Sequence, residues 1–304
     1  MSGEIASGAP SYYDYASLKG PVWTWEVPAY FFVGGAAGAA ALIGAVARRT
    51  GGPESLVRDA RWIAAAGGAL SPPLLISDLG RPGRFLNMLR VFKLRSPMSV
   101  GAWTLVAFSN AAAAAAFADL AQRATHGRFP ITIVADASEI LSAGTGLILS
   151  TYTGVLLGAT AIPVWSHNTS LLPLHFGASG LGSAVSMLEL LGHRERALNA
   201  IGIGTALAET AMAAHFHTSA APSMRAINHG PAGRLALAAG VLAGPVPLLL
   251  RLLAGRSRTA RRVAALSTIA GSFLTRSAWV AAGRTSAAPG QAIATNDRAG
   301  GRLA

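Results

Sequence analysis

Long apolar blocks constrain this chain more than any other feature. A bilayer core about 30 Å thick needs roughly 20 consecutive apolar residues for each helical crossing. Blocks of that length recur through the sequence, and we predict transmembrane spans at about residues 27–47, 60–79, 98–121, 138–162, 169–191, 197–216, 234–254 and 263–283. The expected fold is therefore an all-α integral membrane protein with eight transmembrane helices. The same pattern argues against a soluble globular enzyme.

The same pattern divides the chain into three parts. Residues 1–22 are expected to form an N-terminal tail, and 23–283 the eight-helix transmembrane domain. Residues 284–304 are rich in alanine, glycine and polar side chains, and we expect a disordered C-terminal tail. Small residues spaced four apart, such as Gly34 and Gly38, are expected to let neighbouring helices pack closely.

Charge and cysteine content narrow the possible functions. The chain has a formal net charge of +12, which would suggest nucleic acid for a soluble protein. Here the arginines fall between the apolar blocks, so we expect membrane lipid and no nucleic acid. The sequence contains no cysteine, which excludes disulfides, cysteine-ligated iron–sulfur clusters and thiolate zinc sites on this chain. Any iron–sulfur centre must belong to a partner.

The distribution of lysine and arginine also predicts an orientation. These residues are more frequent in the connections after the odd-numbered spans, once the unusual segment 81–95 is set aside. The positive-inside rule then places those connections in the cytoplasm and both termini outside, in a multi-pass protein of the cytoplasmic membrane. Residues 84–95 show an amphipathic helical pattern, and we expect this segment either to lie in the headgroup layer or to form an ordinary interfacial loop.

The most distinctive polar residues gather at the outer end of the first two spans. Asp78 follows directly on an apolar helix, and Arg81 comes three residues later. Glu26 and Tyr30 are four apart at the entrance to the first span, so they share a helix face. Ionisable groups at the end of an apolar membrane helix cost free energy, and they are therefore candidates for a functional role. The alternatives are a helix-end salt bridge for Asp78 and a solvated cap for Glu26.

Other polar residues lie inside the predicted spans. His175 in the fifth span is a candidate hydrogen-bond donor to a quinone, or a structural partner of a neighbouring helix, and Tyr152 is a similar case. Glu209 and Arg276 fall at like depth and predict a buried ion pair, either structural or part of a proton path. Glu189 would extend that path towards the opposite side.

Three segments together resemble the NrfD/polysulfide reductase membrane-subunit (PsrC-like) family. The segments are WTWEVPAYFFVGG (23–35), SPPLLISDLGRPGRFLNMLRVFKLRSPMSVGAW (71–103) and STYTGVLLGATAIPVW (150–165). The resemblance implies two four-helix halves. It also implies electron exchange between membrane quinone and a ferredoxin-like iron–sulfur subunit, which usually serves a molybdopterin catalytic subunit. Members of this type carry no redox cofactor, so menaquinone or ubiquinone would be a substrate.

The resemblance also implies where the quinone binds. The family pocket is built from the start of the first span and the connection after the second, which here correspond to Glu26, Tyr30, Asp78 and Arg81. Family members can place histidine or asparagine near the first-span entrance, where this chain has glutamate and tyrosine. Quinone type and direction of electron flow therefore stay open.

We predict a quinone-binding subunit of a multi-subunit oxidoreductase. Asp78 and Glu26 would exchange protons, Tyr30 and His175 would orient the headgroup, and Arg81 would tune Asp78. The first alternative is a secondary transporter or proton-translocating subunit that uses Glu189, Glu209 and Arg276, with prolines in the second and seventh spans breaking helices. The second is a haem-bearing anchor ligated by His175 and His215 or His217, which we disfavour because the latter two lie at a span edge.

Overall fold

The computed structural model describes residues 20–81, 83–125, 132–254 and 257–287, and all regular structure among them is helical. Most of the predicted N-terminal tail and the predicted disordered tail beyond residue 287 lie outside these ranges. The long helices follow the predicted spans in order: α1 (Glu26–Arg49), α2 (Glu54–Asp78), α4 (Pro97–Ala124), α5 (Thr132–Gly158), α7 (Leu171–Leu190), α8 (Arg196–Thr218), α10 (Gly230–Ala243) with α11 (Pro245–Ala254), and α12 (Arg258–Ser286).

Four short elements lie between the long helices: α3 (Gly83–Met88), α6 (Pro163–Ser166), the 3-10 helix η2 (Pro222–Met224) and α9 (Arg225–Asn228). The predicted amphipathic segment 84–95 is thus helical only as far as Met88. A second helix starts at Pro97, where the Ser96 side chain accepts a hydrogen bond from the Ser99 backbone N–H. The segment is therefore part helix and part connecting loop, and the structure includes no membrane that would place it in the headgroup layer.

Six of the long segments in the described residues are long and apolar enough to cross a membrane, namely α1, α4, α5, α7, α8 and the α10–α11 pair. Helices α2 and α12 have similar lengths of 25 and 29 residues but do not meet that test. Both contain charged side chains that the structure buries, such as Arg61 in α2 and Arg276 in α12. The structure supports a multi-pass membrane protein, with six crossings by length and composition.

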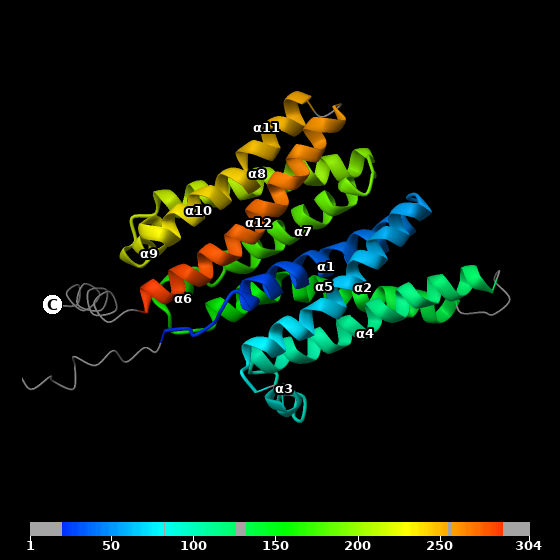
Figure 1. The fold of residues 1–304 in the computed structure, drawn as a ribbon, viewed down its shortest axis with the longest axis horizontal. Helices are drawn as coiled ribbons and strands as arrows, with labels where there is room; N and C mark the ends of the chain where they lie inside the picture. Colours follow the sequence, from blue (N-terminus) through cyan, green and yellow to red (C-terminus); the bar gives the residue numbers. More distant parts are fainter. Residues whose placement is uncertain (1–19, 82, 126–131, 255–256, 288–304) are drawn as a thin grey trace, which may run out of the picture.

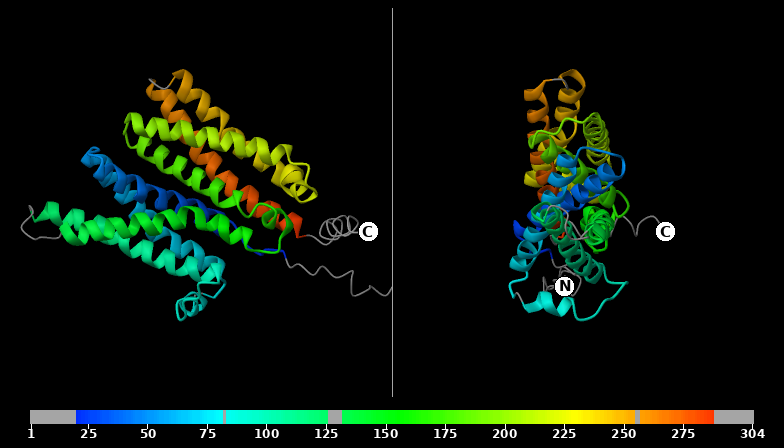
Figure 2. Two further views of the ribbon diagram at one scale, coloured as in Figure 1. Left: turned by 180° about the vertical axis from the view of Figure 1, so that it is seen from behind. Right: turned by 90° about the vertical axis from the view of Figure 1, so that its right-hand side faces the viewer.

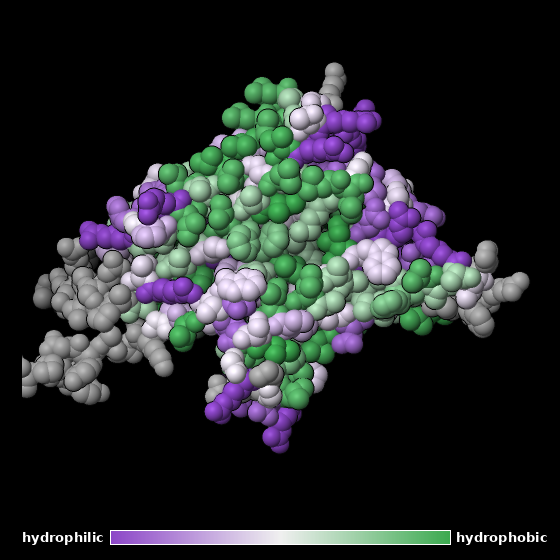
Figure 3. Space-filling model, in the orientation of Figure 1, coloured by the Kyte–Doolittle hydropathy of each residue, from purple (hydrophilic) through white to green (hydrophobic). Residues whose placement is uncertain are grey.

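The long helices form two groups, which lie side by side (Figures 1 and 2). Helices α1, α2, α4 and α5 pack against one another, and α7, α8, α10–α11 and α12 form the second group. The two groups meet where α7 packs against α1 and α5, and where α12 packs against α1. We call them the first and second bundles. On the face drawn in Figure 3, apolar surface covers the middle of the molecule, and hydrophilic residues gather towards its ends.

Proline affects the two bundles differently. Pro72 and Pro73 lie inside α2, which stays continuous, contrary to the expectation that they break the helix. Pro72 lacks the N–H that would bond the carbonyl of Gly68, and the Ser109 hydroxyl of α4 donates to that carbonyl instead, at 2.8 Å. At Pro245 the chain does break into α10 and α11, as predicted. The Leu242 carbonyl there accepts a hydrogen bond from Ser267, at 2.7 Å.

Helices α1 and α5 approach closely at a pair of glycines. A Cβ placed on Gly146 would lie 2.6 Å from the carbonyl oxygen of Gly38, and one on Gly38 would lie 2.3 Å from that of Gly146. The side chain of a larger residue has no room at either position. The predicted packing role of Gly38 is confirmed by this contact. Gly144, on the same helix as Gly146, faces open space.

We predict that Gly146→Ala destabilises the protein by about 2 kcal/mol, because the added methyl group overpacks the α1–α5 contact. The matched control, Gly144→Ala, should be neutral or slightly stabilising, because alanine favours helix at an open position. Unfolding of the two purified variants in the same detergent measures the difference. Equal unfolding midpoints would contradict the close-packing role of Gly146.

Candidate functional site

A carboxylate pair lies where α1 begins and α2 ends. The backbone N–H of Thr24 donates to Asp78 Oδ1 at 3.1 Å, and the Thr24 hydroxyl lies 3.3 Å from the same oxygen. The Thr24 hydroxyl also forms a hydrogen bond to Glu26 Oε2. The structure thus brings Asp78 and Glu26 together through one residue. Thr24 was missed by sequence reasoning, although its position just before a helix and between two tryptophans was a usable signal.

Asp78 borders a narrow cleft between α1, α2, α4 and α5, with a volume of about 80 Å³. Its walls are mostly aromatic and aliphatic, and its polar groups come from Asp78, Tyr30 and Tyr152. An apolar pocket with a few placed polar groups is the usual composition of a small-molecule site. The lining residues are Trp23, Val27, Tyr30, Phe31, Leu75, Asp78, Leu79, Met88, Met98, Gly101, Ala102, Tyr152 and Leu156.

The tyrosines shape two walls of this cleft. Tyr152 donates from its hydroxyl to the carbonyl of Pro97 at 2.6 Å, which ties α5 to the start of α4. The Tyr152 ring packs directly on Gly101, where an added Cβ would lie only 2.0 Å from Cζ of the tyrosine. Tyr30 is 2% exposed, and its hydroxyl has no hydrogen-bond partner among the described residues. That hydroxyl is therefore available to a molecule in the cleft.

Arg81 does not join the carboxylates. Its side chain is exposed and forms no ion pair with Asp78 in the described residues. Gly80, with a φ of 65°, turns the chain sharply between them. The expected tuning of Asp78 by Arg81 is therefore not seen as a direct contact.

His175 lies outside this cleft, contrary to the expectation that it shares the site with Tyr30. It lines a separate small cavity in the second bundle, of about 30 Å³, together with Phe216 and Trp279. The reason is the rotation of α7, which directs His175 towards α8 and α12. Phe31 and Phe176, with ring centroids 6.2 Å apart, pack at the junction of the two bundles between these regions.

Both ring nitrogens of His175 are engaged. Trp279 Nε1 is a donor only and lies 3.3 Å from His175 Nδ1, so Nδ1 accepts and the proton belongs on Nε2. Nε2 lies 3.0 Å from the Glu209 carboxylate and donates to it. This arrangement leaves no free nitrogen lone pair for an axial haem ligand. The other carboxylate oxygen of Glu209 is buried without a partner in the described residues.

The expected ion pair between Glu209 and Arg276 is absent from the described residues, since Glu209 bonds His175 instead. Arg276 is fully buried and is satisfied by uncharged acceptors from three helices. Its guanidinium also lies 5.2 Å from the centroid of the Phe176 ring. The acceptors are the carbonyls of Phe31, Phe176 and Ser272 and the hydroxyls of Ser179 and Ser272, at 2.7–3.2 Å. Arg276 therefore joins α12 to α1 and α7, across the contact between the bundles.

We predict that Arg276→Lys lowers the free energy of unfolding by about 3 kcal/mol, because an ammonium group cannot reach acceptors on all three helices. Arg284→Lys is the matched control, since Arg284 is exposed on the same helix. Thermal unfolding of both variants in detergent measures the effect. If the two variants unfold together, Arg276 does not hold the bundles in contact.

Glu189 is paired with arginines at the opposite end of the second bundle. Its two oxygens accept from Arg251 at 2.8 and 2.7 Å, and one also accepts from Arg261 at 2.5 Å. No hydrogen bond links this group to Glu209 in the described part of the chain. A proton path through Glu189, Glu209 and Arg276 stays a prediction.

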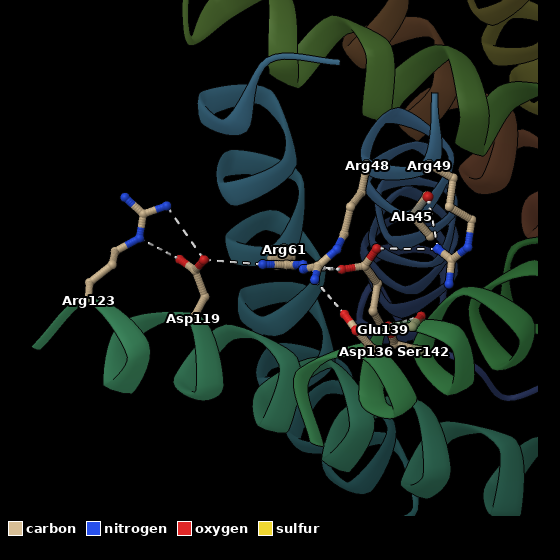
Figure 4. A network of polar contacts seen from close by, with 9 residues as sticks. All are labelled: Ala45, Arg48, Arg49, Arg61, Asp119, Arg123, Asp136, Glu139 and Ser142. Atoms are coloured by element: carbon tan, nitrogen blue, oxygen red, sulfur yellow. Dashed lines mark hydrogen bonds and ion pairs between the residues drawn. The ribbon is translucent and has the colours of Figure 1, made fainter. Parts of the chain in front are cut away.

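The first bundle has a comparable network at the same end (Figure 4). The buried Arg61 bonds Glu139 and also pairs with Asp119 at 3.2 Å. Arg48 and Arg49 approach Glu139 at 3.6 and 3.5 Å. Each bundle therefore has an arginine–carboxylate cluster at the end remote from Asp78.

Comparison with known proteins gives two findings. The family model described as polysulfide reductase matches residues 15–288. The C chain of the polysulfide reductase from Wolinella succinogenes is 30% identical in an alignment 195 residues long, which covers 56% of this chain and 58% of that relative. The alignment thus spans little more than half of the relative's length.

Proposed function

Because this chain belongs to the polysulfide reductase (NrfD) family, we propose that it is the quinone-binding membrane subunit of a multi-subunit oxidoreductase. It would exchange electrons between menaquinone or ubiquinone in the membrane and a docked iron–sulfur subunit. The observation that carries this proposal is the cleft at the first bundle, where the Asp78 carboxylate and the Tyr30 side chain meet apolar walls.

The composition of the cleft fits a quinone headgroup. Trp23 and Phe31 contribute aromatic wall to the cleft, and Leu75 and Leu156 contribute aliphatic wall, which suits a flat apolar ring. Tyr30 can donate a hydrogen bond to a quinone carbonyl oxygen, and Asp78 lies at the edge of the cleft. An isoprenoid tail would extend from the cleft into the lipid.

The chemistry requires both a proton acceptor and an electron acceptor. When a quinol is oxidised, it loses two electrons and two protons, and in the reducing direction each transfer is reversed. Asp78 would take the two quinol protons one after the other, and each would pass through the Thr24 hydroxyl to Glu26 and then to water. The chain contains no cysteine, so the electrons would go to a cluster on the partner. That partner would be a ferredoxin-like subunit serving a molybdopterin enzyme.

The partner would dock at the Asp78 end. Exposed apolar side chains flank the cleft-lining residues in sequence, including Val22 at 81%, Trp25 at 66% and Leu94 at 79% exposure. Such residues favour a second protein or the lipid interface over bulk water. A cluster docked at this end would lie near the quinone, and the electron path would be short.

We predict that Asp78→Asn lowers quinone-dependent turnover of the assembled complex about 100-fold, because asparagine cannot accept the quinol proton. Turnover with a soluble redox dye that reacts at the catalytic subunit should be unchanged. Glu54→Gln is the control, since Glu54 is an exposed carboxylate at the other end of α2. Full quinone-dependent turnover in the Asp78 variant would refute the proton role.

We further propose that α2 and α12 cross the bilayer as well, which makes eight crossings with both termini outside. Both helices run the length of their bundles beside helices that qualify as spans (Figure 1). Their buried arginines are paired or satisfied within the protein, so these charges need not contact lipid. Lysine and arginine placement supports the orientation.

The native chain has no cysteine, so single cysteines report sidedness without background. We predict that Lys93→Cys reacts with an impermeant maleimide in intact cells, whereas Thr50→Cys reacts only after permeabilisation. Across α12, Arg284→Cys should likewise react in intact cells, and Ser257→Cys should react only after permeabilisation. Labelling of both members of a pair from one side would show that the helix between them does not cross. Reversed labelling of both pairs would contradict the orientation.

A further inference from the structure

The end of the second bundle remote from Asp78 contains an open polar cavity of about 590 Å³. It lies between the α7–α8 connection, the start of α8, the end of α11 and the start of α12. Among the described residues, four arginines and no acidic residue line it, the arginines being Arg194, Arg196, Arg251 and Arg261. Hydrophilic surface gathers at this end of the molecule beside the apolar belt (Figure 3).

The buried part of this site has more positive than negative charge. The Arg251 and Arg261 side chains are only 1% and 10% exposed, and both pair with the single carboxylate of Glu189. The Nε atoms of both are buried without a partner in the described residues. Two buried guanidiniums that share one carboxylate leave a net positive charge, which is costly unless another anion compensates it.

Further donors border the same cavity. Helix α8 begins at Arg196 without a side-chain cap, so its first backbone N–H groups carry the positive end of the helix dipole. Loss of solvent and the positive charges of Arg258, Arg261 and Arg262 lower the pKa of the Arg194 guanidinium from its ordinary value. An anion in this place would therefore meet several donors, while the carboxylate at the N-cap of α8, Glu195, lies 3.8 Å from His193 and is absent from the cavity lining.

A comparable cavity at the same end of the first bundle provides a contrast. It has a similar volume, about 620 Å³, but Glu54 and Asp119 line it together with three arginines. Its buried Arg61 has two carboxylate partners, Glu139 and Asp119 (Figure 4). The charge there is balanced within the protein, and an added anion would face repulsion.

Exposed apolar side chains adjoin the arginines of the second cavity. Leu252 and Leu253, at the end of α11, line it and are 59% and 83% exposed. An amphiphile satisfies both surfaces at once, since its charged group meets the arginines and its chains meet the leucines. The planar guanidinium group of arginine can donate two parallel hydrogen bonds to the oxygens of a phosphate.

We propose that this cavity binds the phosphate headgroup of an anionic phospholipid, with Arg194, Arg196, Arg251 and Arg261 as the recognising cations. The bound lipid supplies the second anion that Glu189 alone does not provide. Its acyl chains lie along the exposed leucines of α11. This inference concerns the end of the protein remote from the quinone cleft and does not depend on the proposed quinone chemistry.

The test compares thermal unfolding of the full chain in a neutral detergent with three additions at equal phosphate concentration. These are phosphatidylglycerol, phosphatidylcholine and inorganic phosphate. Phosphatidylglycerol should raise the unfolding midpoint by about 3 °C, because it binds the folded state alone, and the other two should have little effect. An equal shift with phosphatidylcholine, or none with phosphatidylglycerol, would overturn the proposal. An equal shift with inorganic phosphate would overturn the assignment to lipid.

Two double variants locate the effect. Arg194→Gln with Arg196→Gln removes two exposed cavity arginines that have no ion-pair partner in the described residues, so the fold should persist. This variant should lose more than half of the phosphatidylglycerol shift and retain less of that lipid in native mass spectrometry. Arg48→Gln with Arg123→Gln removes two positive charges from the first-bundle cavity and should keep the shift. Equal responses of the two double variants would refute the site.

Discussion

Polar groups buried in an apolar helix bundle need hydrogen-bond or ion-pair partners, and the packing of the helices in this protein depends on which partners they have. Arg276 shows the constraint most directly, because it is fully buried and has no carboxylate partner in the described residues. It contacts carbonyls and hydroxyls on α1, α7 and α12, and these acceptors are correctly placed only when the two bundles are in contact. The junction in turn fixes the position of α1, whose first turns line the cleft proposed to bind quinone. A single guanidinium thus couples the packing of one bundle to the site of the other.

The same constraint explains which parts of the fold were predictable. The long apolar blocks indicated the long helices in their correct order, because burial in lipid requires a minimum length. The proximity of Glu26 and Asp78 also followed from sequence, since adjacent antiparallel helices bring the start of one beside the end of the next. Helices α2 and α12 mark the limit, because their buried charges lower the apolar signal while the protein itself satisfies those charges.

Side-chain partners within the bundles were less predictable. Glu209 and Arg276 lie at like depth, and opposite charges at one depth suggest a pair, yet Glu209 bonds His175. The choice depends on the rotation of α7 about its own axis, which periodicity alone does not determine. Thr24 illustrates a different limit, since a hydroxyl that bridges two carboxylates leaves no pattern beyond its place before a helix. Sequence therefore located the carboxylates but not the residue that connects them.

The two ends of the protein place ionisable groups in different surroundings. At the cleft, Asp78 and Glu26 are partly exposed, so protons can reach them from water, and the proposed quinone would enter from the lipid side. At the opposite end the charges lie deeper and are held in networks. The first bundle gives its buried Arg61 two carboxylates, whereas the second gives Glu189 two arginines. In the second arrangement the positive charge of the two arginines exceeds the negative charge of Glu189. The exposed leucines next to it favour a lipid as the source of the compensating anion.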